Sequence, residues 1–298
     1  MKILYVAIHG DHDNKDEDSI AWSLEQLGHE VTRVPQKGVR LYFSHVDQVP
    51  RHDFVLFHKW EDVDLISNMP FPRICWYFDL VQSADFTEGA GTGRVEWAKE
   101  VERHCRLFCC TDGDWASLNP TMRKHLCQGM DERVAGFGEP TVPNVAPIIF
   151  VGTVRYSKKR TALMELLKAR YGDQFAVMGE HARTRLHGRA LANLYASTKI
   201  CIAPDNATEG WWSNRVWNTL GLGGFLLHPY VPKLRQMYPA ESLCMYASRE
   251  QLYAQIDCAL NDDDFRKQKQ INGLFITQEC HTYKHRCAKL IKLVEERL

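Results

Sequence analysis

The chain of 298 residues lacks an excess of charge of either sign. Its 37 lysines and arginines balance 37 aspartates and glutamates, which leaves a formal net charge of zero. A protein that coats nucleic acid through charge alone needs a positive field, so the composition disfavours that class. No helix-turn-helix or zinc module is recognisable either. A local basic groove remains compatible with these counts.

Long apolar runs are missing as well. The first apolar stretch, residues 1–8, is too short for a membrane span or a secretory leader and runs on into acidic residues. Internal repeats and low-complexity segments are also absent. We therefore expect a cytoplasmic globular protein with no membrane partner.

The ten cysteines lack the paired spacing of a metal site. Most fall inside apolar runs, as Cys75, Cys109 and Cys201 do, which indicates buried and reduced thiols. His281 and His285 have the spacing of two metal ligands on one helix face. No third ligand accompanies them, so helix packing is the preferred interpretation. The sequence thus predicts no metal site.

What the sequence does contain is an alternation of apolar runs and helical patterns. The runs that predict strands are residues 2–8, 30–34, 53–58, 74–78, 107–110 and 133–137, then 148–151, 175–178, 199–204, 225–227 and 242–246. Strands that alternate with helices form a parallel sheet with helices on both faces. With 45% hydrophobic residues, a chain of this length can fill two such cores.

The proline-rich segment 138–147 is the best candidate for a linker between two domains. We therefore predict an α/β fold with an N-terminal domain, residues 1–140, and a C-terminal domain, residues 141–298. Both are expected to be Rossmann-like, with parallel sheets facing across a cleft and the C-terminal helix packing back on the first domain. Ligands of such sheets bind beyond the C-terminal ends of the strands.

The most informative stretch is residues 205–230, which follows an apolar run. A polar loop leads into a helix that starts near Arg215 and stops at Gly223 and Gly224. The first turn of a helix offers unpaired N–H groups and a positive dipole end, and a guanidinium adds a fork-shaped partner. This arrangement is typical of a phosphate site.

A second candidate anion site follows the predicted strand 148–151. Gly152 and Thr153 form a turn, and Arg155 and Arg160 add charge at the start of the next helix. Taken alone, this segment can also be read as a turn glycine followed by solvated cations, with no anion site. Together with Arg215, however, the two sites can converge on one pyrophosphate.

Three further loops carry candidate residues. Asp79 ends a strand and is a candidate for the base that takes a proton from an acceptor hydroxyl; a strand-end cap is the alternative. His9 and Asp18 flank the first loop and are candidates for acceptor contacts, although Asp18 also suits the dipole of the first helix. Of the adjacent Trp211 and Trp212, one is expected to wall a sugar or base pocket and the other to pack.

Several motifs resemble those of GT-B glycosyltransferases, in particular the CgeB-like group. The segment 205–230 is similar to their donor-site segment, and residues 150–153 with Arg160 resemble the first strand of their C-terminal domain. Residues 279–286 are similar to the His-Thr-Tyr-x-x-Arg segment that ends those proteins. The resemblance implies a GT-B fold that binds a nucleotide sugar in its second domain.

A second resemblance is to bacteriophage DNA β-glucosyltransferase, another GT-B enzyme. In that family the arginines matched by Arg155, Arg160 and Arg215 grip the diphosphate of UDP, and the aspartate matched by Asp79 is the catalytic base. The family's ribose-binding glutamate is replaced here by Asn218, an amide that bonds hydroxyls without charge assistance. Glu209 is a candidate to replace that carboxylate at the sugar.

These resemblances imply transfer of a sugar from a UDP-sugar to a 5-hydroxymethylated pyrimidine in double-stranded DNA. The rival acceptors are a polysaccharide, a spore-coat component or another glycoside, and a catalytically decayed nucleotide-binding protein is a further alternative. A divalent metal is compatible with such a site but not required. A DNA acceptor needs a basic face, for which the candidates are Arg183, Arg185, Arg189 and residues 123–125.

Overall fold

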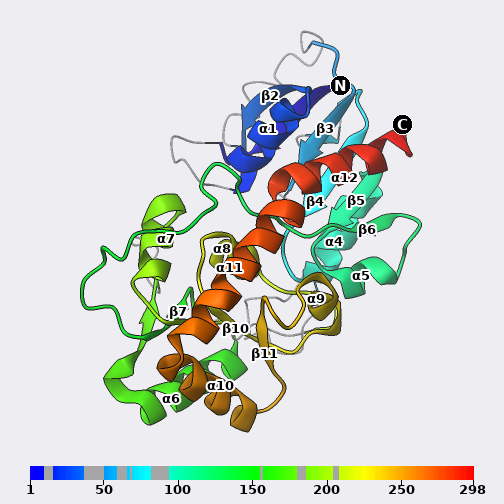
Figure 1. The fold of residues 1–298 in the computed structure, drawn as a ribbon. Coiled ribbons are helices and arrows are strands. Elements are labelled where there is room, and N and C mark those ends of the chain that lie inside the picture. The colour runs from blue at the N-terminus through cyan, green and yellow to red at the C-terminus, as the bar shows by residue number, and fades with distance from the viewer. Residues whose placement is uncertain are drawn as a thin grey trace. The chain divides into compact units, whose positions relative to one another are not determined.

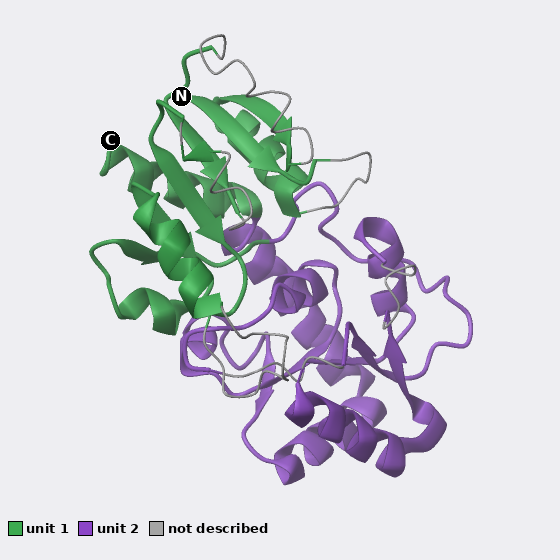
Figure 2. Cartoon of the chain, turned by 180° about the vertical axis from the view of Figure 1, so that it is seen from behind, with its two compact units in different colours: residues 1–82, 91–129, 283–298 green, residues 83–90, 130–282 purple. Residues whose placement is uncertain are grey.

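The computed structural model describes residues 1–9, 16–36, 50–58, 66–67, 69–81, 94–154, 157–179, 186–203 and 208–298. The chain forms two compact units, drawn in different colours in Figure 2. Unit 1 comprises Met1–Gln82, Gly91–Gly129 and Tyr283–Leu298, and unit 2 comprises Ser83–Ala90 and Met130–Thr282. Each unit holds one parallel sheet, so the expected pair of Rossmann-like α/β domains is confirmed.

The sheet of unit 1 has six parallel strands in the order β2-β1-β3-β4-β5-β6 (Figure 1). The strands are β1 (Lys2–Ala7), β2 (Glu30–Pro35), β3 (Phe54–Phe57), β4 (Arg73–Tyr77), β5 (Leu107–Cys110) and β6 (Arg123–His125). The helices of this unit are α1 (Asp16–Gln26), α4 (Arg94–Arg103), α5 (Gly113–Ser117) and α12 (Tyr283–Glu295). The sixth strand is therefore β6, and the prediction of a strand at residues 133–137 is wrong.

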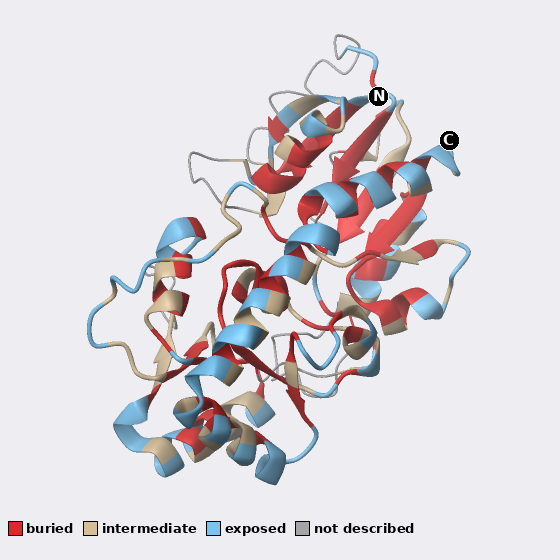
Figure 3. Cartoon of the chain, in the orientation of Figure 1, coloured by how far each residue is buried: buried red, intermediate tan, exposed pale blue. Residues whose placement is uncertain are grey.

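Alternate residues of the central strands fill two separate cores. In β4, Cys75 and Tyr77 face the core with α4 and α5, whereas Ile74 and Trp76 face the core with α1 and α12. This period of two is expected for strands covered on both faces, and β4 is buried from Ile74 to Tyr77 (Figure 3).

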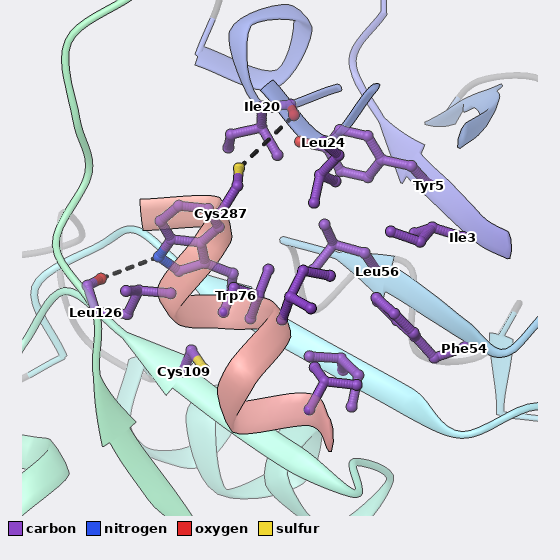
Figure 4. Packing of buried hydrophobic residues seen from close by; sticks show 14 of the residues in the cluster. Ile3, Tyr5, Ile20, Leu24, Phe54, Leu56, Trp76, Cys109, Leu126 and Cys287 are labelled. Atoms are coloured by element: carbon purple, nitrogen blue, oxygen red, sulfur yellow. Dashed lines mark hydrogen bonds between the residues drawn. The ribbon is translucent and has the colours of Figure 1, made fainter. Parts of the chain in front are cut away.

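Helix α12 closes the second of these cores. Figure 4 shows Trp76 donating from Nε1 to the carbonyl oxygen of Leu126, 3.0 Å away, with Cys287 of α12 beside Ile20 of α1. Leu290 and Val294 of α12 are fully buried there. The prediction that the C-terminal helix packs back on the first domain is confirmed.

The sheet of unit 2 has five parallel strands in the order β11-β10-β9-β7-β8. They are β7 (Ile148–Val151), β8 (Phe175–Met178), β9 (Ile200–Ile202), β10 (Leu226–Pro229) and β11 (Cys244–Tyr246). Its helices are α6 (Lys158–Tyr171), α7 (Gly188–Ala196), α8 (Arg215–Gly221), α9 (Pro232–Met237), α10 (Arg249–Asn261) and α11 (Asp263–Cys280), with a 3-10 turn at Gly172–Gln174. No helix in the described ranges is long and apolar enough to cross a bilayer.

The proline-rich segment 138–147 lies within unit 2 and is attached to α7. A Cβ on Gly138 would lie 2.2 Å from the carbonyl carbon of Ala192, so only glycine fits there. The amide of Glu139 donates to Asn193 Oδ1 at 2.9 Å, and that of Val142 donates to Ser197 Oγ at 3.0 Å. Within residues 94–298 the chain passes from unit 1 to unit 2 at Gly129/Met130 and returns at Thr282/Tyr283.

All ten cysteines are free, and those that lie in the sheets are buried except Cys244 of β11, which is half-buried. Burial raises the pKa of the Cys109 thiol to about 12 and that of Cys127 to about 11. Both thiols are therefore fully protonated at neutral pH and poorly nucleophilic.

We expect a thiol reagent such as Ellman's reagent to react quickly with only two cysteines of the native protein, Cys258 and Cys280, which are exposed. The double variant Cys258→Ser/Cys280→Ser should lose the fast phase. In the unfolded wild-type protein all ten thiols should react. A fast phase that survives in the double variant would contradict this burial pattern.

Candidate functional site

The turn after β7 brings two arginines of unit 2 to one glycine. Arg215 Nε donates to the carbonyl oxygen of Val151 at 2.9 Å, and Arg160 Nη1 donates to that of Thr153 at 2.7 Å. Gly152 lies between these carbonyls with a φ of +138°, and a Cβ there would lie 2.7 Å from Arg215 Nη2. Glycine is thus required by both its backbone and its neighbour.

The two guanidinium groups share an aromatic partner. The Cζ atoms of Arg215 and Arg160 lie 4.7 and 5.7 Å from the ring centroid of Phe150, which is fully buried. Cation–π contacts of this kind hold each planar fork in place. Gly152, Thr153, Arg160 and Arg215 therefore lie around one turn, and their joint binding of a pyrophosphate stays a prediction. Arg155 lies outside the described residues.

Helix α6 begins with three cations, which is unusual for the positive end of a helix dipole. Ser157 caps the helix, because its Oγ accepts a hydrogen bond from the backbone N–H of Arg160 at 3.3 Å. Lys158 and Lys159 follow Ser157 directly. No acidic residue occupies this first turn. Each cation there is unfavourable by about 0.3–1 kcal/mol at the positive end, an effect that a bound anion reverses.

Helix α8 presents one half-exposed face that carries Arg215 and Asn218, three residues apart. Its other face is buried, with Trp217 packed 5.8 Å from Tyr238 and 5.1 Å from His281 between ring centroids. This anchor sets the rotation of the helix. Arg215 and Asn218 therefore lie together on the half-exposed face of the helix.

The loop before α8 separates the two adjacent tryptophans. Trp212 is buried and meets Trp217 edge-on, at 6.3 Å between ring centroids. Trp211 is half-buried, and its main chain forms an isolated antiparallel β-bridge with that of Thr208. Glu209 is exposed in the turn between them. Trp212 is the packing member of the pair, and the role of Trp211 and Glu209 at the sugar stays a prediction.

In unit 1, Asp79 is exposed on a turn that follows β4. The turn is held from the β5 side, where Thr111 Oγ1 donates to the carbonyl oxygen of Phe78 at 2.6 Å. The amide of Val81 also donates to Asp112 Oδ2 at 3.0 Å. A solvent-facing carboxylate on a fixed main chain suits a group that must meet a substrate hydroxyl.

We expect Asp112→Ala to lower the free energy of unfolding by about 2–3 kcal/mol, because it removes the cap of α5 and orphans the buried amide of Val81. The matched control is Ser248→Ala, which removes only the cap of α10 and should cost about 1 kcal/mol. Urea unfolding followed by tryptophan fluorescence compares the two. Equal losses would contradict the role of Asp112 in holding the turn.

His9 and Asp18 meet at the same sheet edge. His9 Nδ1 lies 3.4 Å from Asp18 Oδ1, and its Nε2 lies 3.0 Å from the carbonyl oxygen of Tyr5. Asp18 stands in the first turn of α1, where a carboxylate also suits the helix dipole. The sequence picked both residues but missed His58, which follows β3 directly and is buried. The rule that selected Asp79, a polar residue just beyond a buried strand, would have found it.

Residues 158–292 match a family model described as glycosyl transferase-like. The fold of the whole chain is similar to sucrose-phosphate synthase from Thermosynechococcus elongatus, with a TM-score of 0.68 and 13% identity over 99% of this chain and 98% of that one. It is also similar to Anabaena HepE, solved in complex with UDP and glucose, with a TM-score of 0.64 and 12% identity over 99% of this chain and 100% of that one. The structural matches show the GT-B fold, and the glycosyl transferase-like model covers less than half of the chain.

A third structure of this kind is AviGT4, involved in avilamycin A biosynthesis, with a TM-score of 0.59 and 13% identity over 99% of this chain and 97% of that one. No curated protein sequence matches the chain. At such identities the likeness shows the fold, so the roles of individual residues rest on the geometry above.

Two other expectations from the sequence need correction. Arg123, a candidate DNA-phosphate ligand, is buried, with its Nη2 2.8 Å from Glu102 Oε2 and its Cζ 3.9 Å from the ring centroid of Trp115. His281 ends α11 and His285 lies in α12, so the two do not share a helix face. The reason is that α11 ends at Cys280 and α12 begins at Tyr283, and no glycine or proline in the sequence marks this helix end. Arg183 and Arg185 lie outside the described residues.

Proposed function

We propose that the protein transfers a sugar from a UDP-sugar to an acceptor hydroxyl. The observation that carries the proposal is the convergence of Arg160 and Arg215 on the Gly152 turn. Two guanidinium groups beside a glycine turn suit a diphosphate, whose oxygens accept forked hydrogen bonds. HepE, which shares the fold, was solved with UDP and glucose, and this supports a UDP-sugar as the donor.

In the proposed reaction the diphosphate leaves with its negative charge stabilised by Arg160 and Arg215, with Arg155 as a third expected ligand. Fixed cations perform this task without reorganisation, so a divalent metal is not required. Asn218 is assigned to the ribose hydroxyls, since an amide donates and accepts. Glu209 is assigned to the transferred sugar.

Asp79 is the proposed base. The acceptor hydroxyl gives its proton to the Asp79 carboxylate as its oxygen attacks the anomeric carbon, and the bond from that carbon to the diphosphate breaks. Direct attack of this kind inverts the anomeric configuration. His9 and Asp18 are assigned to acceptor contacts and Trp211 to the wall of the sugar pocket.

For the acceptor we propose a 5-hydroxymethylated pyrimidine in DNA, which the enzyme would have to flip out of the duplex. This finer assignment rests on the resemblance of Asp79 and the arginines to the phage DNA enzyme. The burial of Arg123 weakens it, because that residue is unavailable to a DNA phosphate. A carbohydrate acceptor of the CgeB-like kind is the alternative.

The test is a UDP-release assay with a panel of UDP-sugars. It is run without DNA, with unmodified DNA, and with DNA that contains 5-hydroxymethylcytosine or 5-hydroxymethyluracil. Release that requires a hydroxymethylated base supports the DNA acceptor, and release indifferent to DNA supports a carbohydrate acceptor. Binding of UDP without release from any donor would overturn the transferase assignment in favour of a decayed enzyme.

A further inference from the structure

A buried tyrosine–histidine pair ties three neighbouring strands of unit 1 together at their carboxyl edge. Tyr5 of β1 is fully buried, and His58, directly after β3, is 5% exposed. The Tyr5 hydroxyl lies 2.5 Å from His58 Nε2, and His58 Nδ1 lies 2.6 Å from the carbonyl oxygen of Trp76 in β4. The strands β1, β3 and β4 are adjacent in the sheet, so the pair spans all three.

The hydrogen-bond partners determine where the protons lie. A carbonyl oxygen only accepts, so His58 Nδ1 carries a proton and donates to Trp76. In the neutral ring Nε2 then accepts, and the Tyr5 hydroxyl donates to it. Both ring nitrogens are satisfied at a site where an unmatched polar atom would cost about 1–3 kcal/mol. The ring of His58 is therefore held in one orientation.

This fixed ring supports the residue that precedes Asp79. The ring centroids of His58 and Phe78 are 4.2 Å apart with 32° between their planes. The carbonyl oxygen of Phe78 is held by Thr111 Oγ1 at 2.6 Å. The side chain of Phe78 is thus held by His58 and its main chain by Thr111. Asp79 is the next residue in the chain.

We propose that His58, oriented by Tyr5, is a positioning residue for Asp79. The inference rests on the proposed function, in which Asp79 is the base. A base must lie within hydrogen-bond reach of the proton that it removes, and a displacement of about 1 Å can cost about 100-fold in rate. His58 acts through Phe78 and the end of β4 and does not itself touch the substrate.

Two amide replacements separate this role from general stability. The amide nitrogen of Asn takes the place of Nδ1, and that of Gln the place of Nε2, so His58→Asn keeps the donor to Trp76 and His58→Gln loses it. Neither amide side chain replaces the ring that packs against Phe78, so we expect both variants to lower kcat, His58→Gln about 10- to 100-fold and His58→Asn by less, with the donor KM unchanged. His52→Gln is the matched control, because His52 is a buried histidine before β3, at the opposite end of that strand.

A second readout needs no turnover. Hydrogen exchange measured on a peptide over residues 76–81 reports the amide of Val81, which donates to Asp112. We expect the fastest exchange in His58→Gln, a smaller increase in His58→Asn, and wild-type exchange in His52→Gln. Wild-type exchange in His58→Gln, or equally fast exchange in His52→Gln, overturns the proposal. Absence of turnover in the wild type would instead overturn the proposed function, and the exchange data would still decide the role of His58.

Discussion

Arg215→Lys is expected to lower kcat/KM for the sugar donor by about 100- to 1,000-fold. Lysine keeps the charge but loses the planar fork, whose Nε donates to the carbonyl oxygen of Val151 and whose Cζ lies 4.7 Å from the ring centroid of Phe150. The diphosphate should therefore lose an oriented pair of donors as its charge develops. Steady-state kinetics with the preferred UDP-sugar measure the effect.

The control for this variant is Arg249→Lys, at an exposed position in the first turn of α10. It makes the same chemical change on the surface of unit 2 and should leave kcat/KM within a factor of about two, as surface substitutions generally do. A loss of the same size in both variants would show that the fork geometry of Arg215 is not what matters.

Asp79→Asn should lower kcat by about 100- to 10,000-fold and leave the affinity for UDP unchanged. Asparagine has nearly the same shape, so the turn held by Thr111 and Asp112 should persist. An amide cannot take the proton of the acceptor hydroxyl, however, and the chemical step should fail while donor binding survives. Kinetics together with calorimetric titration of UDP separate the two effects.

Asp264→Asn provides the matched change at an exposed carboxylate in the first turn of α11. Its kcat should equal that of the wild type. If Asp79→Asn also retained full kcat, Asp79 would not be the base, and the His9–Asp18 pair at the same sheet edge would be the next candidate.

Local sequence patterns were enough to predict most of the fold. Apolar runs such as residues 107–110 and 148–151 became strands because a buried parallel strand needs a continuous apolar sequence. β6 was missed because its sequence, Arg-Lys-His, has no such pattern. It joins the sheet through long-range contacts, above all the ion pair of Arg123 with Glu102 and the stacking of Arg123 on Trp115.

In the candidate site, too, only the residues that carry a local sequence signal could be predicted. Glycine and arginine at helix starts carry a local signal, so Gly152, Arg160 and Arg215 could be selected together from sequence. Which of Trp211 and Trp212 packs could not, because that depends on Trp217, from a different turn of chain. The partners of His58 are Tyr5 and Trp76, and no local pattern relates residues so far apart in the chain.

The most direct test of the account is a calorimetric comparison of UDP, UMP and uridine binding to the wild-type protein. If Arg160 and Arg215 form a diphosphate site, UDP should bind at least about tenfold more tightly than UMP, and uridine more weakly still. Arg215→Lys should reduce this preference for the diphosphate. Equal affinity for UDP and uridine would contradict the central claim, because the Gly152 turn would then not recognise a phosphate at all.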